Sequence, residues 1–286
     1  MTNTYPNLYK SADKASILSQ NRFVAMIRIE YILLFIIALL SLFYGVVPYL
    51  LILLSVSFLA VIFIIKVIKN PEQEWYRCRA LAESIKTSSW RFMMRAHPFE
   101  DASDVDIPRR EFRNLLREIL RHNEKVAQEL TPDEGDQVTP EMMRTRQGQL
   151  VDRINFYVEN RIDEQRKWYA KKSVFNRRAF RAWVSIILIA YAAIIVATGT
   201  GFFAEAVYRY TLSPLIVLAT SMLGWVQMKR HNELAASYNL AAHEIGLIRV
   251  ASTEISTEEK FSEFVNEAEL AFSREHTQWI ARRDMV

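Results

Sequence analysis

The protein has 286 residues, of which 51% are hydrophobic and 24% are charged, and its formal net charge is +4. Three stretches totalling 75 residues carry no charge, so the charged residues make up about 32% of the other 211, above the roughly 25% of an ordinary soluble domain. Apolar stretches of 18 or more residues indicate membrane-spanning helices, which argues against a purely soluble enzyme. A single cysteine and the lack of a Cys/His cluster with zinc spacing exclude a disulfide scaffold and a zinc module.

The first charge-free stretch, Tyr31–Ile65, follows a polar segment in which we expect no removable signal peptide. It is too long for one crossing, because about 20 helical residues span the hydrocarbon core. We therefore predict two helices over about 27–68 that fold back at Gly45–Pro48, where glycine and proline interrupt the helix. Arg28 and Lys66 would extend both helices by placing their charges at the membrane interface.

Helix signals also dominate between the charge-free stretches. Asn70–Glu72 predicts a helix to about Arg95, because Asn is a good N-cap, proline fits the first turn and an acid favours the N-terminus. Asp106–Pro108 predicts another helix to about Leu130, after which Thr131–Gly135 interrupts the chain.

A long helix is expected to begin at Thr139–Glu141 and to pass through Ile162 toward the second hairpin. In this hairpin Trp183–Phe203 crosses the membrane, Ala204–Arg209 forms the loop, and Tyr210–Met228 returns. We expect this last helix to continue to about Ala251. Residues 256–259 then cap a final helix to about Arg283.

Basic residues flank the outer ends of both predicted hairpins. They are Arg22, Arg28, Lys66, Lys69, Arg77 and Arg79 for the first, and Lys171, Lys172, Arg177, Arg178, Arg181, Lys229 and Arg230 for the second. The two tips carry only Arg209. Because cytoplasmic flanks are enriched in Lys and Arg, we expect both termini and residues 66–182 in the cytoplasm. The cluster from Lys171 to Arg181 resembles a nucleic-acid patch, but it adjoins a span, where anchoring and contact with anionic lipids are the alternative role.

Two matched separations favour an internal duplication. Tyr9 and Tyr169 precede the two hairpins and lie 160 residues apart. Ala80–Glu83 and Ala241–Glu244 follow the hairpins and lie 161 residues apart.

Several motifs resemble the signature of SLATT domains, two-span modules associated with bacterial nucleotide-signalling and anti-phage conflict systems. They are Glu74–Lys86, Trp90–Phe92 and Pro98–Phe99, and near the C-terminus Glu267–Glu269, Ser273–His276 and Trp279. The resemblance implies two fused units, residues 1–99 and 151–286, joined by a cytosolic helical connector at 100–150. It also implies a membrane effector that forms a pore when a nucleotide signal from a partner enzyme changes.

Signals for catalysis are weak. The sequence has no nucleophile elbow, Walker loop, zinc-protease motif or Gly-rich dinucleotide turn. The five histidines are scattered singly, which does not favour a metal or acid–base role. We therefore predict no enzymatic activity, no catalytic residues, no metal and no cofactor.

Basic residues form a stripe on the helix predicted after Asp106. The stripe consists of Arg113, Arg117, Arg121 and Lys125 at four-residue spacing, with Arg109 and Arg110 near its start. Such a stripe could bind the phosphates of a nucleotide or oligonucleotide through bidentate Arg contacts. Glu111, Glu118 and Glu124 favour the alternative of a solvated, ion-paired face.

A second candidate ligand site combines cations with a tryptophan. Its members are Arg79, Lys86, Trp90, Arg91 and Arg95. An indole beside cations can stack on a nucleobase. The alternative is that Trp75 and Trp90 anchor helices to a core or to the membrane interface.

The predicted spans contain hydroxyl side chains and no ionisable residue, which argues against ion-coupled transport. The candidate pore-lining residues are Ser55, Ser57, Thr220 and Ser221, and Thr198 and Thr200 lie in the third span. Their hydroxyls could also bond to their own helix or hold helices together. Four spans cannot enclose a wide aqueous path, so a pore requires several copies of the chain.

These features predict an all-α protein with four transmembrane helices in two hairpins and a helical cytosolic domain. We expect a homo-oligomeric pore gated by a nucleotide or oligonucleotide signal that a partner nucleotidyltransferase makes. Its partners would be the lipid bilayer, further copies of the chain and this signal, with no stable binding to duplex DNA. The alternative is a non-conducting membrane scaffold that recruits cytosolic partners.

Overall fold

The structure is a computed structural model that describes residues 4–100, 104, 106–128, 130, 135–200 and 205–281. All secondary-structure elements within these ranges are helices, which confirms the all-α prediction. The break predicted at Thr131–Glu134, the loop residue Ala204 and the helix end at Arg283 lie outside the described residues.

The chain divides into two compact units, and each is assembled from separated segments of the sequence. The polar unit consists of Met1–Asn21, Pro71–Trp168 and Ala241–Val286. The membrane unit consists of Arg22–Asn70 and Tyr169–Leu240. Each unit therefore contains residues from both halves of the predicted duplication.

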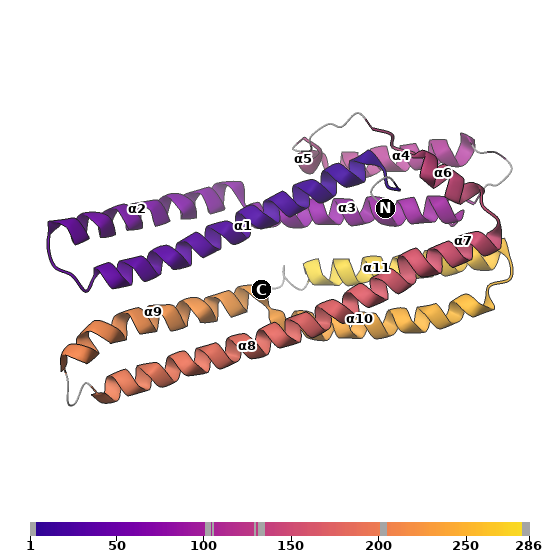
Figure 1. The fold of residues 1–286 in the computed structure, drawn as a ribbon. Helices are drawn as coiled ribbons and strands as arrows, with labels where there is room; N and C mark the ends of the chain where they lie inside the picture. Colours follow the sequence, from indigo (N-terminus) through magenta and orange to yellow (C-terminus); the bar gives the residue numbers. More distant parts are fainter. Residues whose placement is uncertain are drawn as a thin grey trace. The chain divides into compact units, whose positions relative to one another are not determined.

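The first hairpin of the membrane unit is formed by α1 (Asn7–Leu40) and α2 (Val46–Lys69) (Figure 1). The chain reverses between them at residues 41–45, where Gly45 has a φ of 132° that glycine adopts without steric penalty. Pro48 lies in the first turn of α2, where its missing amide hydrogen costs nothing. Two helices are thus confirmed, and the turn lies just before Pro48.

The second hairpin is formed by α8 (Glu164–Thr200) and α9 (Glu205–Lys229) (Figure 1). Because α9 begins at Glu205, the predicted loop at Ala204–Arg209 is wrong for residues 205–209, where an acid and an alanine favour a helix start. The described chain contains four helices that are long and apolar enough to cross a membrane, so the prediction of four spans is confirmed.

Small residues occupy buried positions in the membrane unit. They are Ala38, Ala190, Ala197 and Ala219. Such residues let helix backbones approach closely in membranes. Gly224 of α9 lies close to a side chain of α1, because an added Cβ would lie 2.4 Å from the Tyr31 hydroxyl.

Helix α3 (Pro71–Met94) is the centre of the polar unit. The helices packed on it are α4 (Asp106–His122), α5 (Glu124–Ala127), α6 (Pro140–Gln147), α7 (Leu150–Tyr157) and α11 (Glu258–Ala281). Aromatic rings fill the core between them, and Phe92 of α3 stacks on Phe112 of α4 with centroids 4.8 Å apart. Residues Trp90, Phe99, Tyr157 and Phe261 are also fully buried.

Two predicted helices are shorter than expected. The helix from Asp106 ends at His122 and not near Leu130, because the Asn123 side chain donates to the Ile119 carbonyl and competes with the helix. The helix from Thr139 ends at Gln147, because Gly148 and Gln149 are extended. The start is as predicted, since the Thr139 hydroxyl accepts from the Met142 amide at 3.2 Å.

From Leu150 the chain is helical to Thr200 through α7, a π-helical turn at Val158–Asp163, and α8. After the membrane helices, α10 (His231–Ala251) ends where the sequence predicts. It is separated from α9 by Arg230, which has a φ of 48°. Asn70, between α2 and α3, has a φ of 38°. These two left-handed residues are 160 residues apart, as are Tyr9 and Tyr169, so the duplication extends to the backbone.

Candidate functional site

Trp90 of the second candidate ligand site lies in the core of the polar unit. Its side chain is 2% exposed, and its Nε1 donates to the Tyr5 hydroxyl at 3.0 Å. The rings of Phe156 and Tyr157 lie within 5.8 and 5.6 Å of it. A covered indole offers no free face to a nucleobase, so Trp90 is a core residue here.

Arg79 and Arg95 are engaged inside the same unit. The Arg79 guanidinium pairs with Asp13 at 3.2 Å and with Glu83 at 2.5 Å. Arg95 follows the end of α3, and its Nε donates to the Arg146 carbonyl at 2.8 Å. These two cations therefore stabilise the polar unit.

Lys86 and Arg91 have the fewest hydrogen-bond and ion-pair partners in the second candidate ligand site. Lys86 makes no hydrogen bond or ion pair with any residue that the structure describes. Burial, together with the positive charge of Arg161, lowers the pKa of its ammonium. The Nε of Arg91 is buried and has no acceptor in the described chain. A buried polar atom without a partner is unfavourable, so the Arg91 position costs stability, and burial disfavours the charge of Lys86.

A buried ion pair that we did not predict lies beside these residues. Arg161, in the π-helical turn, donates through Nε and Nη2 to the Glu269 carboxylate at 2.8 and 2.7 Å. The Tyr157 hydroxyl donates to the same carboxylate at 3.0 Å. Burial and the Glu269 charge raise the Tyr157 pKa well above its usual value, so this hydroxyl remains a donor.

Two further buried arginines satisfy the C-terminus of α3. Arg146 donates to the Phe92 carbonyl at 2.6 Å, and Arg153 donates to the Met94 carbonyl at 2.7 Å. The last carbonyls of a helix lack partners within it and carry partial negative charge. Arg153 and Arg161 lie eight residues apart in the continuous helical segment that begins with α7, and this spacing is a signal that could have indicated a buried helix face. Arg146 lies in the separate helix α6.

The basic stripe on α4 has the opposite environment. Arg113, Arg117 and Arg121 are all exposed, whereas Phe112 and Leu116 anchor α4 to the core. Each arginine follows a buried or half-buried position, so the stripe runs along the edge of the packed face. Lys125 is separate from it, because it lies in α5.

The stripe is without acidic partners in the part of the chain that the structure describes. Arg113 and Arg121 form no hydrogen bond or ion pair there, and Arg117 donates only to Asn114 at 3.1 Å. Its glutamate neighbours do not reach ion-pair distance; they are Glu111, Glu118 and Glu124. The geometry therefore leaves these guanidiniums available to an external anion.

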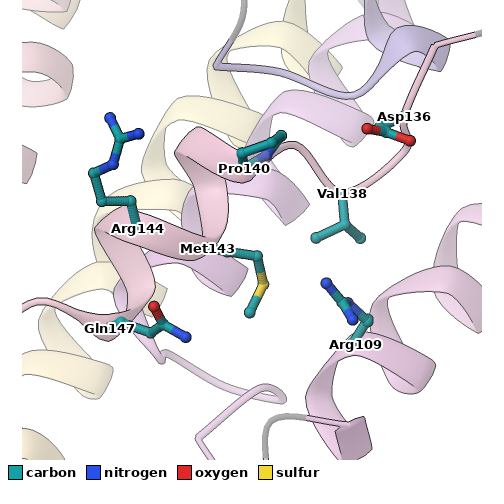
Figure 2. Close-up of a pocket in the computed structure, with 7 residues that line it drawn as sticks. All are labelled: Arg109, Asp136, Val138, Pro140, Met143, Arg144 and Gln147. Carbon is teal, nitrogen blue, oxygen red and sulfur yellow. The ribbon is translucent and has the colours of Figure 1, made fainter.

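An open hollow of about 530 Å³ lies at the start of the stripe. It is lined by Arg109, Asp136, Val138, Pro140, Met143, Arg144 and Gln147. Figure 2 shows Arg109 of α4 and Met143 of α6 pointing toward one another across it. Arg109 lies one turn before Arg113, so a ligand in the hollow would be adjacent to the stripe.

Three of the candidate pore residues, Ser55, Ser57 and Thr220, bond to their own helices. The Ser55 and Ser57 hydroxyls donate to the carbonyls of Leu51 and Leu53 at 2.8 Å. The Thr220 hydroxyl donates to Ile216 at 2.9 Å. Ser57 and Thr220 are exposed, and Ser55 and Ser221 are half-buried. Internally bonded hydroxyls can face lipid, water or another copy of the chain at little cost.

Among the described residues, no group of three His, Cys, Asp or Glu side chains could hold a metal ion. Two family models match the chain. Residues 6–154 match the SMODS and SLOG-associating 2TM effector domain 3, and residues 157–279 match the SMODS and SLOG-associating 2TM effector domain 1. The chain belongs to the SLATT family.

SLATT domains are membrane effector domains of conflict systems, and they are not known enzymes. The two matches confirm two fused SLATT units and a multi-pass membrane protein. The first match includes residues 100–150, which we had predicted to be a connector. Searches of curated proteins and of solved structures give no match.

Proposed function

We propose that this SLATT protein is a homo-oligomeric, pore-forming membrane effector gated by a nucleotide or oligonucleotide signal. The observation that carries the proposal is the exposed stripe of Arg113, Arg117 and Arg121, which forms no ion pair with any acid that the structure describes, in a chain of SLATT domains. Guanidiniums bind phosphate through paired hydrogen bonds. A polyanionic signal fits this surface better than a neutral one.

The pore would be assembled from several copies in a bacterial inner membrane, with both termini and residues 66–182 in the cytoplasm. The hydroxyl residues Ser55, Ser57, Thr220 and Ser221 are its proposed lining. Helices α1, α8 and α10 each contribute residues to the polar and the membrane unit. Ligand binding to the polar unit would bias these shared helices between two arrangements.

Ion flux in proteoliposomes tests this function. We expect the purified chain to release an entrapped ion-sensitive dye when extracts of cells that express a partner nucleotidyltransferase are added. The competing function is a non-conducting scaffold that recruits cytosolic partners through its helical unit. A stable complex with a partner and no flux under any nucleotide would favour the scaffold and contradict the pore.

A further inference from the structure

Three contacts in the membrane unit join its four long helices near the ends of their charge-free stretches. The Lys66 Nζ of α2 pairs with Glu30 of α1 at 2.9 Å. The rings of Trp183 in α8 and Trp225 in α9 have centroids 6.4 Å apart, and the Arg28 guanidinium of α1 lies over Trp225. These residues stand at the outer ends of the apolar stretches, where tryptophan typically marks the membrane interface.

The charges at this level are not balanced. Lys66 is paired with Glu30, and Arg230 is paired with Glu233 at 2.5 Å. Arg28 and Lys229 form no ion pair with any described residue, and both lie over the same ring. The distances from the Trp225 centroid are 5.5 Å for the Arg28 Cζ and 5.0 Å for the Lys229 Nζ. Two unneutralised cations near one indole favour an anion between or beside them.

An exposed apolar track leads away from this cluster along α1. Ile32 is one helical turn after Arg28 and Ile36 is one turn further, so all three lie on one face. Their exposed fractions are 57% for Ile32 and 39% for Ile36, and Arg28 is also exposed. A cation at the interface followed by an apolar track matches a phospholipid, whose phosphate lies directly above its acyl chains.

We propose that Arg28, Lys229 and Trp225 bind the phosphate headgroup of an anionic phospholipid whose acyl chain lies against Ile32 and Ile36. The site is independent of the proposed pore, because a conducting and a non-conducting assembly would both present it to the bilayer. A lipid at this position would contact α1 and α9 together and hold the two hairpins at the interface.

Lipid retention measured by native mass spectrometry tests the site. The full-length protein is extracted from bilayers of phosphatidylcholine and phosphatidylglycerol and is then progressively delipidated. We expect preferential retention of phosphatidylglycerol, reduced about tenfold in Arg28→Gln/Lys229→Gln, since each cation near a bilayer contributes substantially to anionic lipid binding. The control Lys125→Gln/Lys260→Gln removes two exposed charges of the polar unit and should retain the preference. An equal loss of phosphatidylglycerol retention in both double variants would overturn the proposed lipid site.

Two further measurements keep the proposal testable if the double variant does not fold. The variant Arg28→Lys/Lys229→Arg preserves both charges and should keep the phosphatidylglycerol preference. Inorganic phosphate added to the wild-type protein should not displace the lipid, because it has no acyl chain for the apolar track. Displacement by phosphate, or equal retention of the two lipids by the wild type, would contradict a headgroup site.

Discussion

Arg161 and Glu269 form a bidentate ion pair in the polar unit, with side chains that are 2% and 0% exposed. Burial disfavours the charge of Arg161, but the adjacent Glu269 carboxylate raises its pKa, so the guanidinium stays charged. The Tyr157 hydroxyl satisfies a further lone pair of the carboxylate. This pair joins the π-helical turn after α7 to α11, and α11 in turn packs on α3.

Removing the carboxylate should destabilise the protein strongly. Glu269→Ala leaves Arg161 as an uncompensated buried charge, which typically costs about 3–5 kcal/mol. We expect a marked fall in the thermal unfolding midpoint of the purified protein. The control Glu267→Ala, an exposed residue of the same helix, should lie within about 0.5 kcal/mol of wild type. Similar midpoints for both variants would contradict a structural role for the pair.

Replacing Lys86 should have the opposite effect. The folded state lowers the Lys86 pKa, so between this lowered pKa and the ordinary one the unfolded chain binds more protons at this site and stability rises with pH. Lys86→Met removes the charge, and we expect about 1 kcal/mol of stabilisation at neutral pH that shrinks as the pH approaches 10. Denaturation at several pH values, with exposed Lys14→Met as control, measures this. A loss of stability in Lys86→Met at neutral pH would show that the ammonium has a stabilising partner.

The hairpins themselves were accessible to sequence reasoning. Charge-free stretches of sufficient length, and the Gly45 and Pro48 interruption, follow from the membrane as a solvent and from local backbone preferences. The break at Asn70 was predicted from its N-cap and the proline that follows it. The break at the αL residue Arg230 was not predicted, because this residue is not glycine and no proline or capping signal follows it.

The candidate site could also be predicted only in part from the sequence. Exposure of the α4 stripe follows from its amphipathic spacing, which sequence shows directly. The buried arginines could not be found by a rule that places charges at the surface. Arg153 and Arg161 are buried with the Met94 carbonyl and Glu269 as their partners. Because these partners are distant in the sequence, no local pattern indicates the burial. The burial of Trp90 by Tyr5 and Tyr157 is likewise a long-range contact.

Close packing of α1 against α9 predicts sensitivity at Gly224. An added methyl would lie 2.4 Å from the Tyr31 hydroxyl and 3.2 Å from its Cζ. We expect Gly224→Ala to destabilise the protein by about 1–3 kcal/mol through overpacking. Tyr31→Phe removes the nearest atom, so the double variant should recover part of the loss in a thermal unfolding assay. Additive effects of the two substitutions would contradict the contact.

The α4 stripe predicts a salt-dependent interaction with phosphates. Arg113→Gln/Arg117→Gln/Arg121→Gln should keep the stability of wild type, because the three side chains are exposed. If they contact a single-stranded oligonucleotide, the slope of log affinity against log salt should fall by about 0.7 for each lost contact. The matched control is Arg177→Gln/Arg178→Gln/Arg181→Gln. An unchanged salt slope in the stripe variant would show that these arginines form a solvated face and do not contact phosphate.

The central claim is that a phosphate-bearing signal bound at the α4 stripe controls conductance. Its most direct test is the current across a planar bilayer that contains the purified protein, recorded as products of a partner nucleotidyltransferase are added. We predict a ligand-dependent change in conductance for the wild type and for Arg177→Gln/Arg178→Gln/Arg181→Gln. The change should be absent in Arg113→Gln/Arg117→Gln/Arg121→Gln. Identical responses of the stripe variant and the wild type, or no current from an intact oligomer under any ligand, would contradict it.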